Sequence, residues 1–156
     1  MLTQAQIEAK YGKANPTGKG YLVTIKLPFP MRLAWDRKTK IKSFQCHKLI
    51  HDRLLAVYND LLAYYGYDKL VELGIDLYGG CFNYRLMRGS TKTLSKHSWA
   101  IAVDHDPDRN LLHETKKTAR FARPEYKPML DIWYKHGFFN LGVEKDYDWM
   151  HNETAI

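Results

Sequence analysis

The most informative stretch of the sequence is Ser95-Lys96-His97-Ser98-Trp99-Ala100-Ile101-Ala102-Val103-Asp104. Its second half alternates, because Ile101 and Val103 fall on one side while Ala102 and Asp104 fall on the other. Alternation of this kind predicts a strand over residues 100–104. The strand ends on a carboxylate beside a small side chain, and a histidine precedes it on the chain. The stretch therefore predicts both one strand of a sheet and one wall of a polar site.

A second histidine near the C-terminus completes a possible ligand set. It lies in Asp148-Trp149-Met150-His151. Two imidazoles and one carboxylate, from His97, His151 and Asp104, form a three-ligand zinc set that leaves a coordination position open, as catalytic sites require. Asp148 is placed to act as a general base. Taken by spacing alone, ordinary surface or core histidines remain the alternative interpretation.

The sequence around this stretch mixes helical and strand patterns. We expect a strand over 21–27 that stops at Pro28, an exposed loop over 37–40, a helix over 43–65, a short helix over 69–73, a strand over 75–83, a helix over 124–136 and an extended tail from 147. Helices and strands are thus mixed along the chain, and the strands do not all follow one another directly. This order predicts an α+β fold, with a small, mainly antiparallel sheet flanked by helices.

Length and composition favour one globular domain over residues 1–156. The chain has 156 residues, of which 45% are apolar and 13% aromatic, so disorder is excluded. The start, Met1-Leu2-Thr3-Gln4-Ala5, has no signal-peptide pattern, and no apolar run approaches the roughly 20 residues of a membrane span. Cys46 and Cys81 have no Cys-x-x-Cys spacing, and we expect two buried free thiols.

The net charge of +7 is unevenly distributed. Residues 1–90 hold 14 Lys and Arg against 7 Asp and Glu, whereas residues 91–156 hold 10 against 10. A basic surface favours a polyanionic partner, which can be a nucleic acid, an anionic lipid or an acidic cell-wall polymer. Because the chain has no recognisable nucleic-acid-binding motif, we do not expect a nucleic-acid partner.

The other histidines give weaker patterns. His47 and His51 have the spacing of a metalloprotease zinc helix, but Lys48 occupies the position of the base glutamate, so the signature fails. We expect a solvated or partly buried pair there. His105, His113 and His136 have no partner pattern and are interpreted as surface or core residues.

Order, spacing and flanking residues together resemble a known family. The pattern Ser-x-His-x-x-x-x-Ala-x-Asp over 95–104, followed by Asp-x-x-His over 148–151, resembles the signature of the zinc D-Ala-D-Ala and L-Ala-D-Glu peptidases. These enzymes cleave peptidoglycan and share a fold with the hedgehog signalling domain. The segment 78–90, YGGCFNYRLMRGS, is similar to the strand and arginine segment of phage members. Trp133, Gly137 and Phe138 fit the passage before the last ligand, so the resemblance covers roughly residues 43–153.

The resemblance implies a role for each matching residue. It implies zinc ligands at His97, Asp104 and His151, a catalytic carboxylate at Asp148, and a substrate-holding arginine at Arg85, with Arg88 as the competing candidate. An ordinary surface cation is the alternative for either arginine. Ser95 would support the ligand loop by hydrogen bonding. Trp99 and Trp149 would either line the cleft or pack in the core.

Two positions depart from the family pattern. Family members usually have glycine where this chain has Ala100, and an aromatic residue where it has Asn152. Neither change removes a ligand or the base. They bear on pocket shape and substrate preference more than on the chemistry.

The resemblance implies a zinc-dependent hydrolase of the peptidoglycan stem peptide. The closest type is a phage endolysin that cleaves the L-Ala–D-Glu bond. The alternatives are a D-Ala-D-Ala carboxypeptidase and a non-catalytic zinc-binding module for the cell wall. As an endolysin it would be made in the host cytoplasm without a signal peptide and would act on the wall after release. We expect a monomer whose partner is peptidoglycan, without stable insertion into a membrane.

Overall fold

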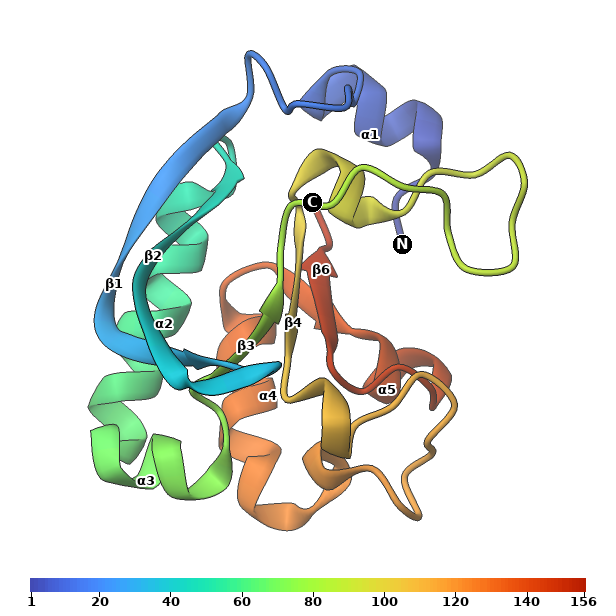
Figure 1. Cartoon of the computed structure of the whole chain (residues 1–156). Coiled ribbons are helices and arrows are strands. Elements are labelled where there is room, and N and C mark those ends of the chain that lie inside the picture. Colours follow the sequence, from blue (N-terminus) through green and yellow to red (C-terminus); the bar gives the residue numbers. More distant parts are fainter.

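Six strands form one mixed sheet in the computed structural model, which describes all residues 1–156 (Figure 1). The order across the sheet is β2-β1-β3-β4-β6-β5. The strands are β1 (Leu22–Leu33), β2 (Asp36–His47), β3 (Leu77–Gly80), β4 (Ala102–His105), β5 (Phe138–Asn140) and β6 (His151–Thr154). Only β1 and β3 pair in parallel, and every other neighbouring pair is antiparallel. The expected α+β fold with a mainly antiparallel sheet is confirmed.

Five helices accompany the sheet. They are α1 (Gln4–Tyr11), α2 (His51–Tyr65), α3 (Tyr67–Leu73), α4 (Lys127–Lys135) and α5 (Leu141–Lys145). Leu54, Val57 and Leu61 of α2 recur at helical spacing and are buried. Helix α2 packs against β1 and α4, and α4 packs against β5, so these two helices cover one face of the sheet (Figure 1). No helix has the length and apolar character needed to cross a bilayer.

The predicted start of the long helix is wrong. Residues 43–47 belong to β2, and α2 begins only at His51. Phe44 and Cys46 pair with Ile25 and Val23 of β1, and both are buried while Gln45 between them is exposed. That two-residue alternation is the mark of a half-buried strand. His51 therefore does not share a helical face with the histidine four residues earlier.

The strand predicted to stop at Pro28 instead continues to Leu33, and the predicted loop over 37–40 lies in β2. The pairing of β1 with β2 shifts register between Lys26 and Met31, which places Pro28 in a bulge. A bulged residue needs no ladder hydrogen bond from its backbone nitrogen, so proline is tolerated there. The two strands thus form one long, bent hairpin.

Two further features concern the cysteines and the N-terminal helix. Cys46 and Cys81 are buried free thiols, as expected. Helix α1 was not predicted, although it carries a capping-box signal. The Thr3 hydroxyl accepts a hydrogen bond from the Gln6 backbone, and the Gln6 side chain accepts one from the Thr3 backbone.

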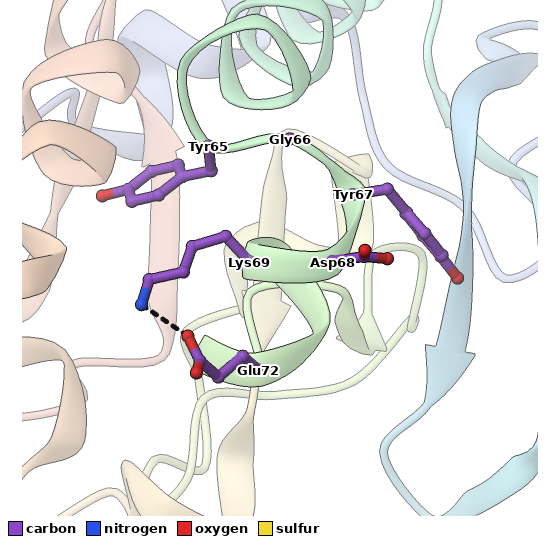
Figure 2. A pocket seen from close by; sticks show the side chains of 6 residues that line it. All are labelled: Tyr65, Gly66, Tyr67, Asp68, Lys69 and Glu72. Carbon is purple, nitrogen blue, oxygen red and sulfur yellow. Dashed lines mark ion pairs between the residues drawn. The ribbon is translucent and has the colours of Figure 1, made fainter.

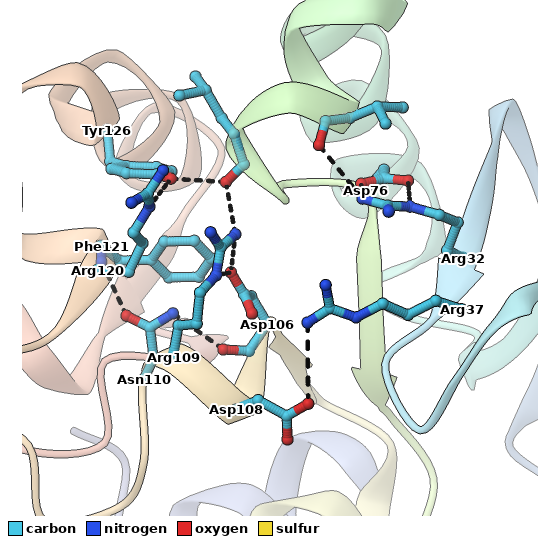
Figure 3. A network of polar contacts seen from close by, with 12 residues as sticks. Arg32, Arg37, Asp76, Asp106, Asp108, Arg109, Asn110, Arg120, Phe121 and Tyr126 are labelled. Carbon is cyan, nitrogen blue, oxygen red and sulfur yellow. Dashed lines mark hydrogen bonds and ion pairs between the residues drawn. The ribbon is translucent and has the colours of Figure 1, made fainter.

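A buried polar network fixes the chain that follows β4 (Figure 3). Asp106 accepts hydrogen bonds from Arg109, and the side chain of Asn110 accepts one from the Phe121 backbone. The hydroxyl of Tyr126 donates to the carbonyl of Leu73 at the end of α3. The segment 106–126 is therefore anchored at several points, and part of it forms a wall of the site described next.

Candidate metal centre

A short 3-10 turn, Lys96–Trp99, positions the first histidine of the site. The Ser95 hydroxyl caps this turn by accepting a hydrogen bond from the backbone of His97 at 3.2 Å, which is the supporting role predicted for it. Ala100 ends the turn in the left-handed conformation, with φ of 55°, and redirects the chain into β4. The ring of His97 is thereby held beside that strand.

The carboxylate of Asp104 lies on the face of the sheet opposite α2 and α4. Its neighbour His105 is buried on the helical face, where its ring nitrogen lies 2.9 Å from the hydroxyl of Tyr58. Because successive residues of a strand point to opposite faces, Asp104 points away from the helices. The register of β4 with β6 pairs Asp104 directly with His151. The sheet thus brings together two residues that are far apart in the sequence.

The three predicted ligands form one cluster. One ligand atom each from His97, Asp104 and His151 lies within 4.8 Å of the other two. His97 Nε2 is 3.2 Å from Asp104 Oδ2, and His151 Nδ1 is 3.1 Å from Asp104 Oδ1. Ligand distances of about 2.0–2.2 Å in a tetrahedral zinc site separate neighbouring ligand atoms by roughly 3.3 Å. The cluster therefore has the spacing of a metal centre.

The hydrogen bonds of His97 leave one ring nitrogen free for a metal. Nδ1 lies 2.8 Å from the carbonyl oxygen of Cys81, which can only accept, so Nδ1 carries the proton. Nε2 then has a lone pair and faces the carboxylate of Asp104, which is also an acceptor. Nε2 is buried and has no hydrogen-bond partner. A buried nitrogen left in this way fits a metal ligand, since a bound cation would satisfy both acceptors.

Glu153 orients the second histidine and was missed in the sequence analysis. His151 Nε2 donates to Glu153 Oε1 at 2.9 Å, which directs Nδ1 toward Asp104. Burial lowers the pKa of His151, but the hydrogen bonds to Asp104 and Glu153 outweigh it and raise that pKa to about 10. The two-residue spacing from His151 on a strand was the available signal, because it places both side chains on one face.

The charges of the cluster call for a cation. Glu153 is buried and Asp104 largely so, and neither forms an ion pair with lysine or arginine. Burial alone would raise the pKa of Asp104, yet His97 and His151 hold it well below its usual range. The imidazolium of His151 contacts both carboxylates but compensates only one of the two charges. A divalent metal ion would compensate both, bound by His97 Nε2 and, in place of its proton, by His151 Nδ1.

Replacing Glu153 should weaken metal binding. Glu153→Ala is expected to lower zinc affinity about 10- to 100-fold, because partners that orient a ligand histidine contribute this much. Glu153→Gln should recover most of that loss, since its amide oxygen still accepts from His151 Nε2. Zinc affinity would be measured by competition with a chromogenic chelator. Equal losses in the two variants would indicate that charge, and not orientation of the ring, is what Glu153 supplies.

Asp148 stands beside the cluster without belonging to it. Its Oδ2 lies 4.0 Å from His151 Nδ1, and its backbone nitrogen donates to the carbonyl of Leu112 at 2.9 Å. Asp148 adopts the left-handed conformation, with φ of 55°, which aspartate tolerates better than most residues. Burial raises the pKa of its carboxyl, while His151 acts in the opposite direction. A carboxylate with a raised pKa suits proton transfer near neutral pH.

A cleft of about 320 Å³ opens onto the cluster and onto Asp148. Arg85, Arg88 and Ser95 line this cleft, as does Lys96. Arg88 is exposed, whereas Arg85 is partly buried, with its backbone nitrogen and oxygen bonded to Ser98 and Ser95. The two arginines thus lie where a substrate bound at the cluster would meet them.

Two predicted cleft residues pack elsewhere, and one unpredicted residue joins the cleft. Trp99 and Trp149 belong to the hydrophobic core, which is the packing alternative stated for them, and they do not line the cleft. His113, interpreted as a surface or core residue, lines the cleft from the segment anchored behind β4. No pattern in the sequence links His113 to the ligand residues, because the connection is made only by the fold.

The left-handed backbone at Ala100 determines which residues are tolerated at this position. Left-handed φ costs an L-residue about 1–2 kcal/mol, but glycine would add backbone freedom worth about 0.5–1 kcal/mol and remove a buried methyl worth about 0.8 kcal/mol. Ala100→Gly should therefore change the free energy of unfolding by less than about 1 kcal/mol. Ala100→Val should lower it by at least about 2 kcal/mol, since a β-branched residue fits neither the backbone nor the filled core. Urea unfolding measures both, and a tolerated valine would contradict the assigned backbone conformation.

A second hollow, at the junction of α2 and α3, offers no comparable chemistry. It has a volume of about 630 Å³ and is lined by Tyr65, Gly66, Tyr67, Asp68, Lys69 and Glu72 (Figure 2). Lys69 and Glu72 pair with each other at 2.5 Å in this open, exposed place. The only cluster of three metal-ligating side chains is the one formed by His97, Asp104 and His151.

Comparisons with protein-family models, with curated proteins and with solved structures gave no match to this chain. The case for a function therefore rests on the chemistry of the cleft. This chemistry combines a cluster of three side chains that could hold a metal ion, a neighbouring carboxylate and a cationic wall formed by Arg85, Arg88 and Lys96.

Proposed function

We propose that this protein is a zinc-dependent peptidase that hydrolyses an amide bond in the stem peptide of peptidoglycan. The observation that carries the proposal is the placement of Asp148 in the same cleft as the cluster of His97, Asp104 and His151. The L-Ala–D-Glu bond is the first candidate, as in a phage endolysin, and terminal D-Ala–D-Ala is the second. Both follow from the resemblance of the ligand pattern to the peptidoglycan peptidases.

The residues of the cleft suit amide hydrolysis. A zinc ion, when bound, supplies a Lewis acid that polarises a carbonyl group and acidifies water. His97 would hold it through Nε2, His151 through Nδ1 and Asp104 through its carboxylate, since these atoms face one another in the cluster while His97 Nδ1 and His151 Nε2 are bonded to Cys81 and Glu153. Three protein ligands leave a coordination position for the reaction.

Asp148 would move the proton in this scheme. Its carboxylate takes a proton from the attacking water and gives it to the departing amine, so that the amine leaves as a neutral group. Its pKa, raised by burial, favours the second transfer without preventing the first. A module that only binds zinc needs no such base, and Asp148 is therefore the feature that favours an enzyme over a binding module.

The cationic wall would bind the substrate. Arg85, Arg88 and Lys96 line the cleft from the side of the ligand turn, and the carboxylates of Asp104, Asp148 and Glu153 also line it. Stem peptides carry carboxylates, which guanidinium groups bind with good geometry. Arginine would orient the substrate or neutralise charge that develops on the carbonyl oxygen.

Product analysis tests the proposal. Purified peptidoglycan is incubated with the zinc-loaded protein and, in parallel, with the protein after chelation, and new termini are identified by mass spectrometry. We expect fragments cut within the stem peptide only in the zinc-loaded reaction, with masses that distinguish L-Ala–D-Glu from D-Ala–D-Ala cleavage. The proposal fails if the zinc-loaded protein cuts no stem-peptide bond.

A further inference from the structure

The charge of the protein is concentrated in one hairpin, remote along the sheet from the metal centre. Residues 22–48 comprise β1, β2 and the start of the next turn, and we call them the basic ribbon. They hold seven Lys and Arg against one Asp, a net charge of +6, while the rest of the chain holds 17 against 16. Nearly all of the net charge of +7 therefore lies in 27 residues.

Most of these cations are free to bind a ligand. Lys26, Lys38, Lys40 and Lys42 are exposed and form no ion pair. Arg37 is also exposed, and its pairing with an aspartate across 3.9 Å is loose (Figure 3). Elsewhere on the surface, lysines of α3 and α4 have acidic partners at 2.5 Å. Arg32 is paired with Asp76, but with Asp36 as its only acidic residue the ribbon keeps a largely uncompensated positive field.

Protection of an edge strand explains only part of this arrangement. Strand β2 forms one edge of the sheet, and lysines on such edges prevent pairing with other chains. However, Lys26 lies on the inner strand β1, and Lys48 follows β2, so the charge extends beyond the free edge. A single inward or edge lysine would suffice for protection. The ribbon therefore has more exposed lysines than edge protection requires, as expected of a surface that binds an anion.

The pattern fits a linear anion better than a base-reading surface. Alternate residues of a strand, such as Lys40 and Lys42, are about 7 Å apart, comparable with the repeat of an extended phosphodiester chain. The ribbon exposes one large aromatic side chain, Trp35, whereas Phe29 and Phe44 are buried. Proteins that bind single-stranded nucleic acid stack successive bases on several aromatic residues. A row of lysines without several exposed aromatic side chains recognises phosphates and not bases.

We propose that the basic ribbon binds a linear poly(polyol phosphate), the phosphodiester polymer of poly(glycerol phosphate) type. This binding is separate from the metal centre, because the ribbon lies at the β2 edge of the sheet and the ligands lie on β4, β6 and the turn before β4 (Figure 1). If the chain acts on a cell wall, such binding would hold it on the envelope. If the ribbon does not bind the polymer, the proposed hydrolysis is unaffected. If the protein does not hydrolyse the stem peptide, the proposed binding by the ribbon is unaffected.

The test compares two triple variants of the full chain. Lys38→Gln/Lys40→Gln/Lys42→Gln removes three ribbon charges, and Lys116→Gln/Lys117→Gln/Lys145→Gln removes three exposed charges outside it. Binding to poly(glycerol phosphate) is measured by calorimetry over a series of salt concentrations. We expect the ribbon variant to lose at least tenfold in affinity and the control less than threefold. The slope of log affinity against log salt should become shallower by about 2, since each lost contact contributes roughly 0.7.

Several outcomes would overturn the proposal. Equal losses in both variants would show a general effect of net charge. Tighter binding of single-stranded DNA of equal charge, lost in Trp35→Ala, would identify a nucleic-acid surface. Binding only to vesicles with anionic headgroups would identify a membrane surface. A ribbon variant that aggregates at unchanged affinity would leave edge protection as the role of the lysines. Thermal unfolding of each variant checks that the fold is retained.

Discussion

Replacing Asp148 with asparagine is expected to lower kcat/KM for stem-peptide hydrolysis about 10²- to 10⁴-fold, the usual contribution of a general acid–base group. Asparagine keeps the shape of the side chain and tolerates the left-handed backbone at this position. Zinc affinity should stay within about threefold of the unaltered protein, because Asp148 is not among the ligands. The combination of retained metal and lost turnover is what separates a base from a ligand.

Two further measurements make this prediction specific. Asp108→Asn, which alters an exposed carboxylate outside the cleft, should leave kcat/KM unchanged. Asp148→Ala would be a poorer probe, since alanine adds backbone strain at a positive φ. If Asp148→Asn retains hydrolysis, the proton must move by another route, and the assignment of the base is wrong.

Replacing His97 with alanine is expected to lower zinc affinity about 10²- to 10³-fold. Structural zinc sites bind with about 10–16 kcal/mol over four ligands, so each ligand contributes roughly 2.5–4 kcal/mol, and 1.4 kcal/mol corresponds to a factor of ten. Zinc should also cease to stabilise the fold. In the unaltered protein, zinc at 100 times its Kd adds about 2.7 kcal/mol, which corresponds to a rise in Tm of roughly 5–10 °C.

The cleft supplies a matched control for this variant. His113 lines the same cleft but lies outside the ligand cluster. His113→Ala should therefore bind zinc with unchanged affinity and show the full rise in Tm. The ligand assignment would have to be abandoned if His113→Ala lost as much affinity as His97→Ala.

Local patterns identified the three residues of the cluster because their signals lie within short stretches. The alternation of 100–104 predicted a strand ending at Asp104, and β4 and β6 do carry Asp104 and His151. The predicted bounds were wrong, because β4 spans Ala102–His105 and residues 147–150 form a turn before β6. What the sequence did not reveal was the pairing of those two strands, which brings the residues to within 3.1 Å. The same pairing buries Glu153 beside His151. Their two-residue spacing on a strand indicates a shared face, but it does not by itself predict the hydrogen bond between the two side chains.

The largest error in the predicted fold lies where a helical and a strand periodicity are both compatible with the sequence. The stretch over 43–50 has apolar residues compatible with a helix, but Phe44 and Cys46 alternate and pair with β1. Prolines at 28 and 30 appeared to end the first strand, although a bulge accommodates them. Tertiary pairing overrode local preference in both places. His113 was missed for the same reason, since only the anchored segment 106–126 brings it to the cleft.

Anomalous X-ray diffraction at the zinc edge, from crystals of the zinc-loaded protein, tests the metal centre most directly. We predict a single strong anomalous peak from a zinc ion bonded to His97 Nε2, the Asp104 carboxylate and His151 Nδ1, at about 2.0–2.2 Å from each ligand atom. Glu153 should remain hydrogen-bonded to His151 Nε2. No peak between these three side chains, or a peak bonded to His151 through Nε2, would contradict the account.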